Sequence, residues 1–215
     1  MSHEVRAVRP SPLLAEFFGI LFGDGFMNRY ADGHYSIEIA GHAIDDLEYH
    51  GCHIAALMRS LFHKNPSLRI RHDQQTLCTR VNSKRILGVL KSYGMPLGKK
   101  TALAIPEWIM CDIAYRRAFL RGLFDTDGSV IVRTRGQHSI SLGLADEHLI
   151  RQVRGILEAE GFFVAYHAYE RRDPRGFTSV TYSIRINRKA LFKKFFQIIG
   201  SSHPKKVEKV KKVAR

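Results

Sequence analysis

The chain has 215 residues, 45% hydrophobic and 25% charged, so it can bury a full core without disulfide support. Its formal net charge of +14 favours a polyanionic partner. Three cysteines without a close-spaced pair argue against a disulfide framework and a zinc knuckle. No apolar run approaches the roughly 18 residues of a membrane span, and the N-terminal residues lack the apolar core of a signal peptide. We therefore expect an intracellular protein, cytoplasmic or organellar, with no membrane partner.

Hydrophobic periodicity predicts two runs of elements in the same order. In the first half we expect a helix over 12–24, a strand over 35–42, a helix over 45–63, strands over 67–72 and 75–81, and a helix over 83–93. In the second half we expect a helix over 112–127, strands near 129–134 and 137–144, a helix over 146–160, strands near 162–170 and 177–186, and a helix over 188–199. We interpret both halves as αββαββα, joined by a proline-containing linker over 94–109.

Three pairs of matched segments indicate an internal duplication. "FFGILFGDGF" aligns with "FLRGLFDTDGSV" so that Asp24 matches Asp127, 103 residues later. "RVNSKRIL" aligns with "RINRKALF", and "YGMPLGKK" with "IGSSHPKK", at offsets of 105 and 106 residues. The sequence therefore predicts an N-terminal repeat with the start of the linker over 1–103, a C-terminal repeat over 104–202 and a basic tail over 203–215. Their net charges are +4, +5 and +5, so the folded body itself is basic.

A single Gly-Asp-Gly segment is typical of a hairpin turn or a helix end. The second copy favours a function, because Gly19 and Gly23 in one copy correspond to Gly122 and Thr126 in the other. Small residues four apart let two helix backbones approach closely. Such packing would bring Asp24 and Asp127 together at two negative helix ends, where bound divalent cations would relieve their repulsion. Oxygen-only ligands favour Mg²⁺, with the carbonyls of Gly23 and Thr126 as further donors.

Polar residues, among them several arginines, alternate with apolar ones along the predicted strands of both halves. Helices can cover only the apolar sheet face, so the other face presents side chains that reach phosphates and base edges in a major groove. An ordinary solvated face remains the alternative. The candidate DNA contacts are Ser36, Glu38, His42, Arg69, Arg71, Arg80, Arg133, Arg135, Ser139, Ser141, Ser179, Thr181, Ser183 and Arg185.

The paired motifs resemble those of single-chain LAGLIDADG homing endonucleases, and the final Asp-Gly is intact in both copies. The chain departs from the usual pattern at Phe18, Phe22 and Gly23 in the first copy, and at Arg121 and Thr126 in the second. The resemblance covers nearly the whole chain. It implies an α+β fold of two pseudo-twofold-related αββαββα halves, each with an antiparallel sheet that forms a DNA-binding saddle, joined through the two packed motif helices.

The resemblance also implies an activity. Asp24 and Asp127 would bind metal ions, and the protein would hydrolyse both strands of a long specific DNA site, leaving 3′ overhangs. Mg²⁺ or Mn²⁺ would support cleavage, and Ca²⁺ would support binding without cleavage. One lysine of each matched pair, Lys99/Lys100 and Lys205/Lys206, would stabilise the transition state. We expect a monomer. Two alternatives stay open: a maturase that binds intron RNA, and a non-catalytic DNA-binding protein of the same fold.

Overall fold

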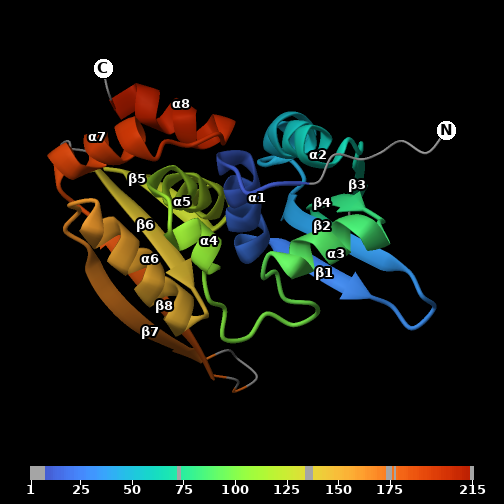
Figure 1. The fold of residues 1–215 in the computed structure, drawn as a ribbon. Helices are drawn as coiled ribbons and strands as arrows, with labels where there is room; N and C mark the ends of the chain where they lie inside the picture. Colours follow the sequence, from blue (N-terminus) through green and yellow to red (C-terminus); the bar gives the residue numbers. More distant parts are fainter. Residues whose placement is uncertain (1–7, 72–73, 134–137, 173–175, 177, 214–215) are drawn as a thin grey trace.

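The computed structural model describes residues 8–71, 74–133, 138–172, 176 and 178–213. The first half contains, in chain order, α1 (Pro12–Gly23), β1 (Gly25–Arg29), β2 (Tyr35–His42), the π-helix η1 (Tyr49–Ile54), α2 (Ala55–Phe62), β3 (Ser67–Arg71), β4 (Thr76–Val81) and α3 (Lys84–Ser92) (Figure 1). The second half contains α4 (Glu107–Met110), α5 (Ile113–Asp127), β5 (Gly128–Val132), β6 (His138–Leu144), α6 (Glu147–Ala159), β7 (Ala165–Arg172), β8 (Thr178–Ile186), α7 (Lys189–Ile198) and α8 (Pro204–Val213).

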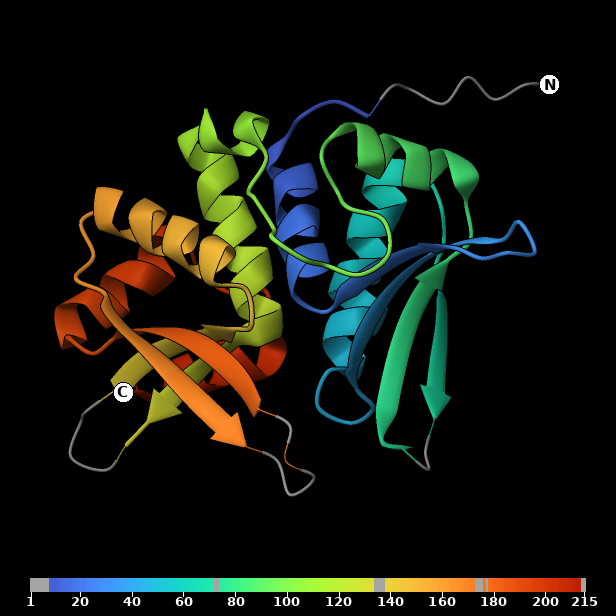
Figure 2. The same cartoon turned by 90° about the horizontal axis from the view of Figure 1, so that it is seen from below.

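Each half forms one four-stranded antiparallel sheet. The strand orders are β1-β2-β4-β3 and β5-β6-β8-β7, which are the same order in the two repeats. The register also repeats, because Gly25 pairs with Ile39 and Gly128 with Leu142. Figure 2 shows the two sheets on opposite sides of a central pair of helices, α1 and α5. The predicted α+β fold of two αββαββα repeats related by a pseudo-twofold axis is confirmed.

Local sequence explains where the two central helices begin. The Ser11 side chain accepts a hydrogen bond from Leu14 N at the start of α1, and Pro12 occupies the first turn. The Asp112 side chain accepts from the first backbone N–H groups of α5 in the same way. Asp24 ends α1, and Gly128 ends α5. The starts of the two motif helices are therefore set by their own flanking residues.

Four elements differ from the prediction, and one of them is the short helix α4, which begins within the predicted linker over 94–109. The predicted helix over 45–63 contains the π-helical segment η1, which the hydrophobic pattern does not reveal. Residues 25–29 form β1, the strand that the order αββαββα requires before β2. The predicted basic tail contains α8, which packs against β5 (Figure 1). The domain boundaries at residues 103 and 202 stay predictions.

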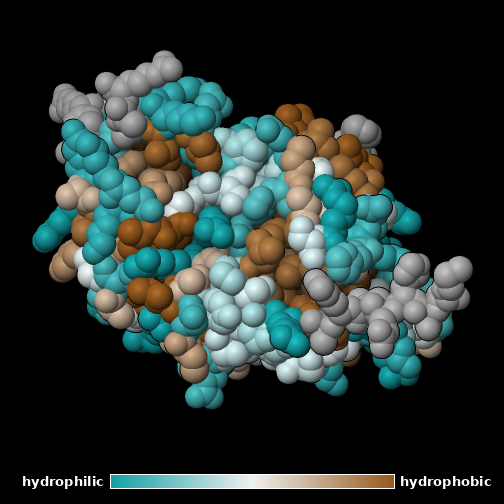
Figure 3. Space-filling view, turned by 45° about the horizontal axis from the view of Figure 1, so that its top comes forward, coloured by the Kyte–Doolittle hydropathy of each residue, from teal (hydrophilic) through white to brown (hydrophobic). Residues whose placement is uncertain are grey.

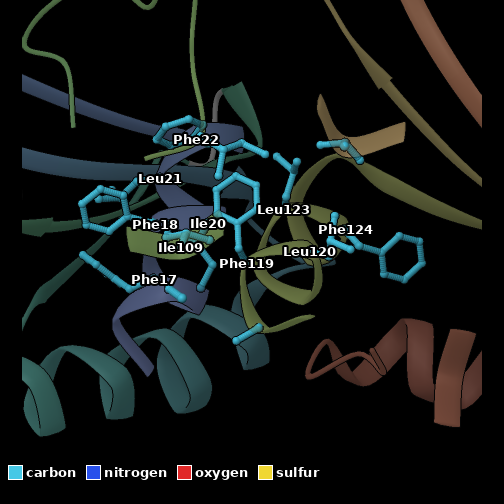
Figure 4. Packing of buried hydrophobic residues seen from close by; sticks show 14 of the residues in the cluster. Phe17, Phe18, Ile20, Leu21, Phe22, Ile109, Phe119, Leu120, Leu123 and Phe124 are labelled. Atoms are coloured by element: carbon cyan, nitrogen blue, oxygen red, sulfur yellow. The ribbon is translucent and has the colours of Figure 1, made fainter. Parts of the chain in front are cut away.

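The core is continuous from one half to the other through α1 and α5. Figure 4 shows the apolar side chains of these helices filling the space between the sheets. The rings of Phe22 and Phe119, one from each helix, meet edge to face with their centroids 5.3 Å apart. Phe18, also in the core, meets Trp108 of α4 in the same geometry at 5.4 Å. The two repeats therefore share one hydrophobic core.

The edge strand β3 is exposed along its whole length. Leu68 and Ile70, expected on the covered apolar face, keep 41% and 37% of their surface exposed.

Figure 3 shows hydrophobic residues in separate patches among hydrophilic ones on the face that it draws. Within the described residues, no helix is long and apolar enough to cross a membrane.

Candidate active site

The two motif helices are in backbone contact. A Cβ atom added to Gly19 would lie 2.1 Å from Phe119 O, and one added to Gly122 would lie 2.1 Å from Glu16 O. A Cβ atom at Gly23 would lie 2.0 Å from the Thr126 hydroxyl oxygen. Only glycine fits these positions, so the spacing of small residues produces the close helix packing that the sequence predicts. Threonine is tolerated at 126 because its partner position has no side chain.

This packing brings Asp24 and Asp127 to the same end of the helix pair. Asp24 follows the last residue of α1, and Asp127 is the last residue of α5. A Cβ atom at Gly23 would lie 2.1 Å from the Asp127 Oδ2 atom, which shows how closely this carboxylate approaches the end of α1. The Thr126 hydroxyl lies 3.0 Å from the same oxygen.

The pKa values of both carboxylates are raised. Asp24 keeps an open side to solvent, but surrounding protein removes water from its carboxylate, and the charge of Asp127 adds to this. Together these effects raise the pKa of Asp24 to about 6. Loss of hydration also raises the pKa of Asp127, although the Thr126 hydroxyl and the nearby lysines oppose the shift. Both carboxylates therefore hold a proton more tightly than an ordinary aspartate does, and added positive charge nearby would favour their ionised forms.

One lysine of each matched pair lies at the end of a motif helix. Lys100 Nζ donates to Leu21 O at 3.2 Å, to Phe22 O at 3.0 Å and to Gly23 O at the end of α1. Lys206 Nζ donates to Phe124 O at 2.5 Å and to Asp125 O at 2.8 Å near the end of α5. A cation is favoured at such a negative helix end. Burial lowers the pKa of Lys100 and lowers that of Lys206 to about 8.

The other member of each pair lies elsewhere. Lys99 is exposed, and Lys205, also exposed, forms an ion pair with Asp45. Lys100 and Lys206 are therefore the lysines that the structure brings to the carboxylates. The two lysines of each pair are adjacent in the sequence, and no sequence feature indicates which of them lies near the carboxylates.

The oxygen donors at this site fit a hard divalent cation. Mg²⁺ is commonly held by one or two carboxylates together with water and phosphate oxygens, so two carboxylates such as Asp24 and Asp127 would be enough protein ligands for it. Gly23 O accepts a hydrogen bond from Lys100, and its second lone pair remains for a metal ion. Among the described residues, no group of three or more His, Cys, Asp and Glu side chains is placed to hold a metal.

A buried polar network that the sequence analysis did not predict lies below the carboxylates. Glu16 of α1 accepts hydrogen bonds from Arg121 of α5 at 2.5 Å and from His53 at 2.7 Å. Burial alone would raise the pKa of Glu16, but the hydrogen bonds from these two partners outweigh it and lower the pKa to about 2. Asp125 accepts from Ser201 Oγ at 2.5 Å and from Ser202 N at 2.7 Å. An acidic residue inside an apolar helix, as at Glu16, was the available signal.

A cleft of about 460 Å³ opens beside Asp127. Its lining includes Lys100 and Gly23 on one side and Asp146, which precedes α6, on the other. Asp127 and Lys100 therefore line one solvent-accessible space.

The predicted DNA contacts differ in accessibility. Arg69, Arg71, Arg133, Ser179 and Thr181 are exposed, and Glu38, His42, Arg80, Ser141 and Arg185 are half-buried. Ser36, Ser139 and Ser183 are buried, at 0%, 7% and 6% exposure, because small side chains on inner strands are covered by larger neighbours. We leave these three serines out of the contacts proposed below. Arg135 lies outside the described residues.

The exposed arginines of the first sheet border a second cleft of about 210 Å³. Arg69 lies opposite Cys78, and Arg71 opposite Thr76, in the register of β3 with β4. In the middle of this surface, Arg80 forms an ion pair with Glu38 at 3.3 Å. Among the described residues, the polar face of this sheet is therefore a basic, hollowed surface whose cleft is lined by one acidic group, Glu38.

Comparison with known proteins confirms the family resemblance. Residues 114–200 match a family model described as the LAGLIDADG-like domain. The chain has a TM-score of 0.61 to I-DmoI in complex with DNA and Mn, at 19% identity, covering 89% of this chain and 98% of that one. It has a TM-score of 0.58 to the I-LtrWI LAGLIDADG homing endonuclease bound to target DNA, at 9% identity over 94% of this chain and 88% of that one. By sequence, residues 114–200 match the LAGLIDADG-like domain model, and the chain shares the fold of these solved LAGLIDADG homing endonucleases.

Segments similar to this chain also occur inside longer proteins. The tRNA-splicing ligase RtcB of Pyrococcus abyssi is 27% identical over 190 residues, which are 80% of this chain and 20% of that protein. The replication factor C small subunit of Methanocaldococcus jannaschii is 27% identical over 146 residues, which are 64% of this chain and 8% of that protein. The chain thus spans a fifth or less of the length of these relatives.

Proposed function

We propose that this chain is a metal-dependent, site-specific DNA endonuclease that cuts both strands of its target. The observation that carries the proposal is the pairing of Asp24 and Asp127 at the ends of two helices in backbone contact, with one lysine at each helix end. Two carboxylates that repel each other and have raised pKa values destabilise the folded protein. A function at this site would explain why both repeats nevertheless contain one.

Asp24 and Asp127 would hold divalent ions, with the carbonyls of Gly23 and Thr126 as additional donors. When bound, such ions lower the pKa of a water molecule and neutralise charge on phosphate oxygens. We expect Mg²⁺ or Mn²⁺ to support cleavage and Ca²⁺ to support binding alone. Solved I-DmoI complexes with DNA that contain Mn or Ca agree with divalent metal use in this fold. Lys100 and Lys206 would place one positive charge beside each scissile phosphate and stabilise its transition state.

The two sheets would contact DNA on both sides of the cleavage centre. The net charge of +14 supplies the attraction to phosphates. The proposed contacts are Arg69, Arg71, Arg80, Arg133, Arg185, Glu38, His42, Ser141, Ser179 and Thr181. Two repeats in one chain already form the pseudo-twofold pair, so we propose that the protein acts as a monomer on a long, nearly unsymmetrical site and leaves 3′ overhangs.

A homing role agrees with the occurrence of similar segments in a ligase and in a replication factor, two proteins of different function. A domain found within unrelated proteins behaves as an independent insertion. If the chain is encoded within a host gene, the rejoined gene without the insertion is the natural candidate target.

The test is a cleavage selection on duplex DNA. The protein is incubated with Mg²⁺ and a library that includes the rejoined host gene, and the new DNA ends are sequenced. We expect one target with 3′ overhangs. The variants Asp24→Asn and Asp127→Asn serve as matched controls: each should bind the selected duplex in a gel shift and fail to cut both strands. If both variants cut at the wild-type rate, the proposed mechanism is wrong. Binding without cutting by the wild-type protein would identify a non-catalytic DNA-binding protein, and tighter binding to intron RNA would favour a maturase.

A further inference from the structure

Two aspartates at matched positions make contacts across the boundary between the repeats. Asp46 precedes the helical turn that begins at Leu47, and Asp146 precedes α6. Each follows the second strand of its own repeat, β2 or β6, after a short loop. Neither residue belongs to the paired motif. Helix-start charge alone does not explain the bond of Asp146 to Leu103, in the first repeat, or of Asp46 to His203, at the start of the tail that follows the second repeat.

Asp146 of the second repeat binds the chain segment that follows α3. Its Oδ2 atom accepts from Leu103 N at 2.7 Å, while its Oδ1 atom accepts from Leu149 N at 2.9 Å and caps α6. Leu103 lies three residues after Lys100. Between them, Ala102 has a φ of 50°, a left-handed conformation that is unfavourable for a residue with a side chain. Such a conformation persists only where its surroundings hold it, and the bond to Asp146 lies next to it.

Asp46 of the first repeat binds the segment that follows α7. Its Oδ1 atom lies 3.0 Å from His203 Nε2, and its Oδ2 atom accepts from His42 N at 2.7 Å. The His203 ring is buried and stacks on Tyr49, with centroids 4.8 Å apart. His203 lies three residues before Lys206, and the neighbouring Lys205 pairs with Asp45 of the same loop.

The two segments begin alike. Gly94 after α3 and Gly200 after α7 both adopt positive φ, at 101° and 77°, and each precedes its lysine by six residues. Lys100 then reaches the end of α1 although Asp146 of the second repeat holds its segment, and Lys206 reaches the end of α5 although Asp46 of the first repeat holds its segment. The arrangement is reciprocal, but the donors differ: a backbone N–H serves on one side and an imidazole on the other.

We propose that Asp46 and Asp146 are positioning residues, each of which holds across the repeat boundary the segment that carries Lys206 or Lys100 to the carboxylates. The inference rests on the proposed function only for the role of the lysines. The position of each lysine is a property of the protein alone and is measurable without DNA.

The test uses full-length protein with ¹⁵N-labelled lysine and measures the exchange of each side-chain ammonium group with water. The variant His203→Phe keeps a ring to stack on Tyr49 and removes the donor to Asp46. The variant Asp146→Ser keeps a capping oxygen for α6 and removes the acceptor for Leu103. We expect His203→Phe to speed exchange at Lys206 by about tenfold or more and to leave Lys100 unchanged, and Asp146→Ser to do the reverse.

Conservative variants provide the rescue. His203→Gln retains a side-chain N–H donor, and Asp146→Asn retains an acceptor, so each should return exchange at its lysine toward the wild-type rate. If His203→Phe or Asp146→Ser fails to fold, His203→Gln and Asp146→Asn still provide a test. In each of these two variants the lysine ammonium group should exchange with water about as slowly as in the wild-type protein. Equal responses of Lys100 and Lys206, or no response in a folded variant, would overturn the proposal.

A second measurement connects the contacts to cleavage. On a supercoiled plasmid carrying the site recovered by selection, His203→Phe and Asp146→Ser should each accumulate nicked product, with opposite strands left uncut. The strand left uncut by His203→Phe should be the one left uncut by Lys206→Met, and the strand left uncut by Asp146→Ser should be the one left uncut by Lys100→Met. Equal slowing on both strands would count against positioning. If the wild-type protein cuts no DNA, the proposed function fails while the ammonium exchange still decides the positioning.

Discussion

Replacing Gly122 by alanine should destabilise the protein although it improves helix propensity. The new Cβ atom would lie 2.1 Å from Glu16 O, whereas an ordinary contact begins at 3.4 Å, so α1 and α5 must separate locally by about 1.3 Å. Because the opposing atom is backbone, the overpacking cost is near the upper end of the usual range, about 3 kcal/mol. Alanine returns about 1 kcal/mol of helix propensity. The net loss of about 2 kcal/mol lowers the Tm by about 4–8 °C for a chain of this length.

Gly155 supplies the matched control. It lies inside α6, and a Cβ atom there would have no neighbour within 4 Å. Gly155→Ala should therefore gain the helix propensity alone, about 1 kcal/mol, and raise the Tm by about 2–4 °C. Thermal unfolding followed by circular dichroism compares both variants with the wild-type protein. A Gly122→Ala variant as stable as Gly155→Ala would refute the backbone contact and, with it, the juxtaposition of Asp24 and Asp127.

Further outcomes follow from the charges of the site and the surface. Because the pKa of Asp24 is about 6, cleavage at limiting Mg²⁺ should fall about tenfold per pH unit below 6, and a flat pH–rate profile between pH 5 and 7 would contradict this. A raised carboxyl pKa destabilises the folded protein as pH rises from 3.8 through about 6. Asp24→Asn should therefore melt higher than wild type at pH 7 but not at pH 4, by about 2 °C or less because Asp24 is exposed. Arg69→Ala should weaken DNA binding and reduce the slope of log K against log salt by about 1; an unchanged slope would remove Arg69 from the phosphate contacts. The free protein should sediment as a monomer, and a stable dimer would contradict the proposal that one chain supplies both repeats.

Residue patterns alone predicted the duplicated fold and singled out the two carboxylates. Hydrophobic periods and matched segments report local structure, so the order of helices and strands could be predicted from residues close together in the chain. The spacing of Gly19 and Gly23 with Gly122 and Thr126 predicted the helix packing, because small residues four apart necessarily share one helix face. From that contact, the approach of Asp24 and Asp127 follows directly.

Which groups surround those carboxylates depends on how distant parts of the chain pack together. Lys99 and Lys100 are equivalent as sequence, and their different directions depend on how the segment after α3 is held by Asp146, 46 residues further along. Burial of Ser36 likewise depends on neighbouring strands, and the bond between His203 and Asp46 joins residues 157 positions apart. Alternation along one strand assigns a side chain to a face but cannot say what covers that face. Contacts between distant residues are fixed by how the two repeats pack, and local patterns carry no record of that packing.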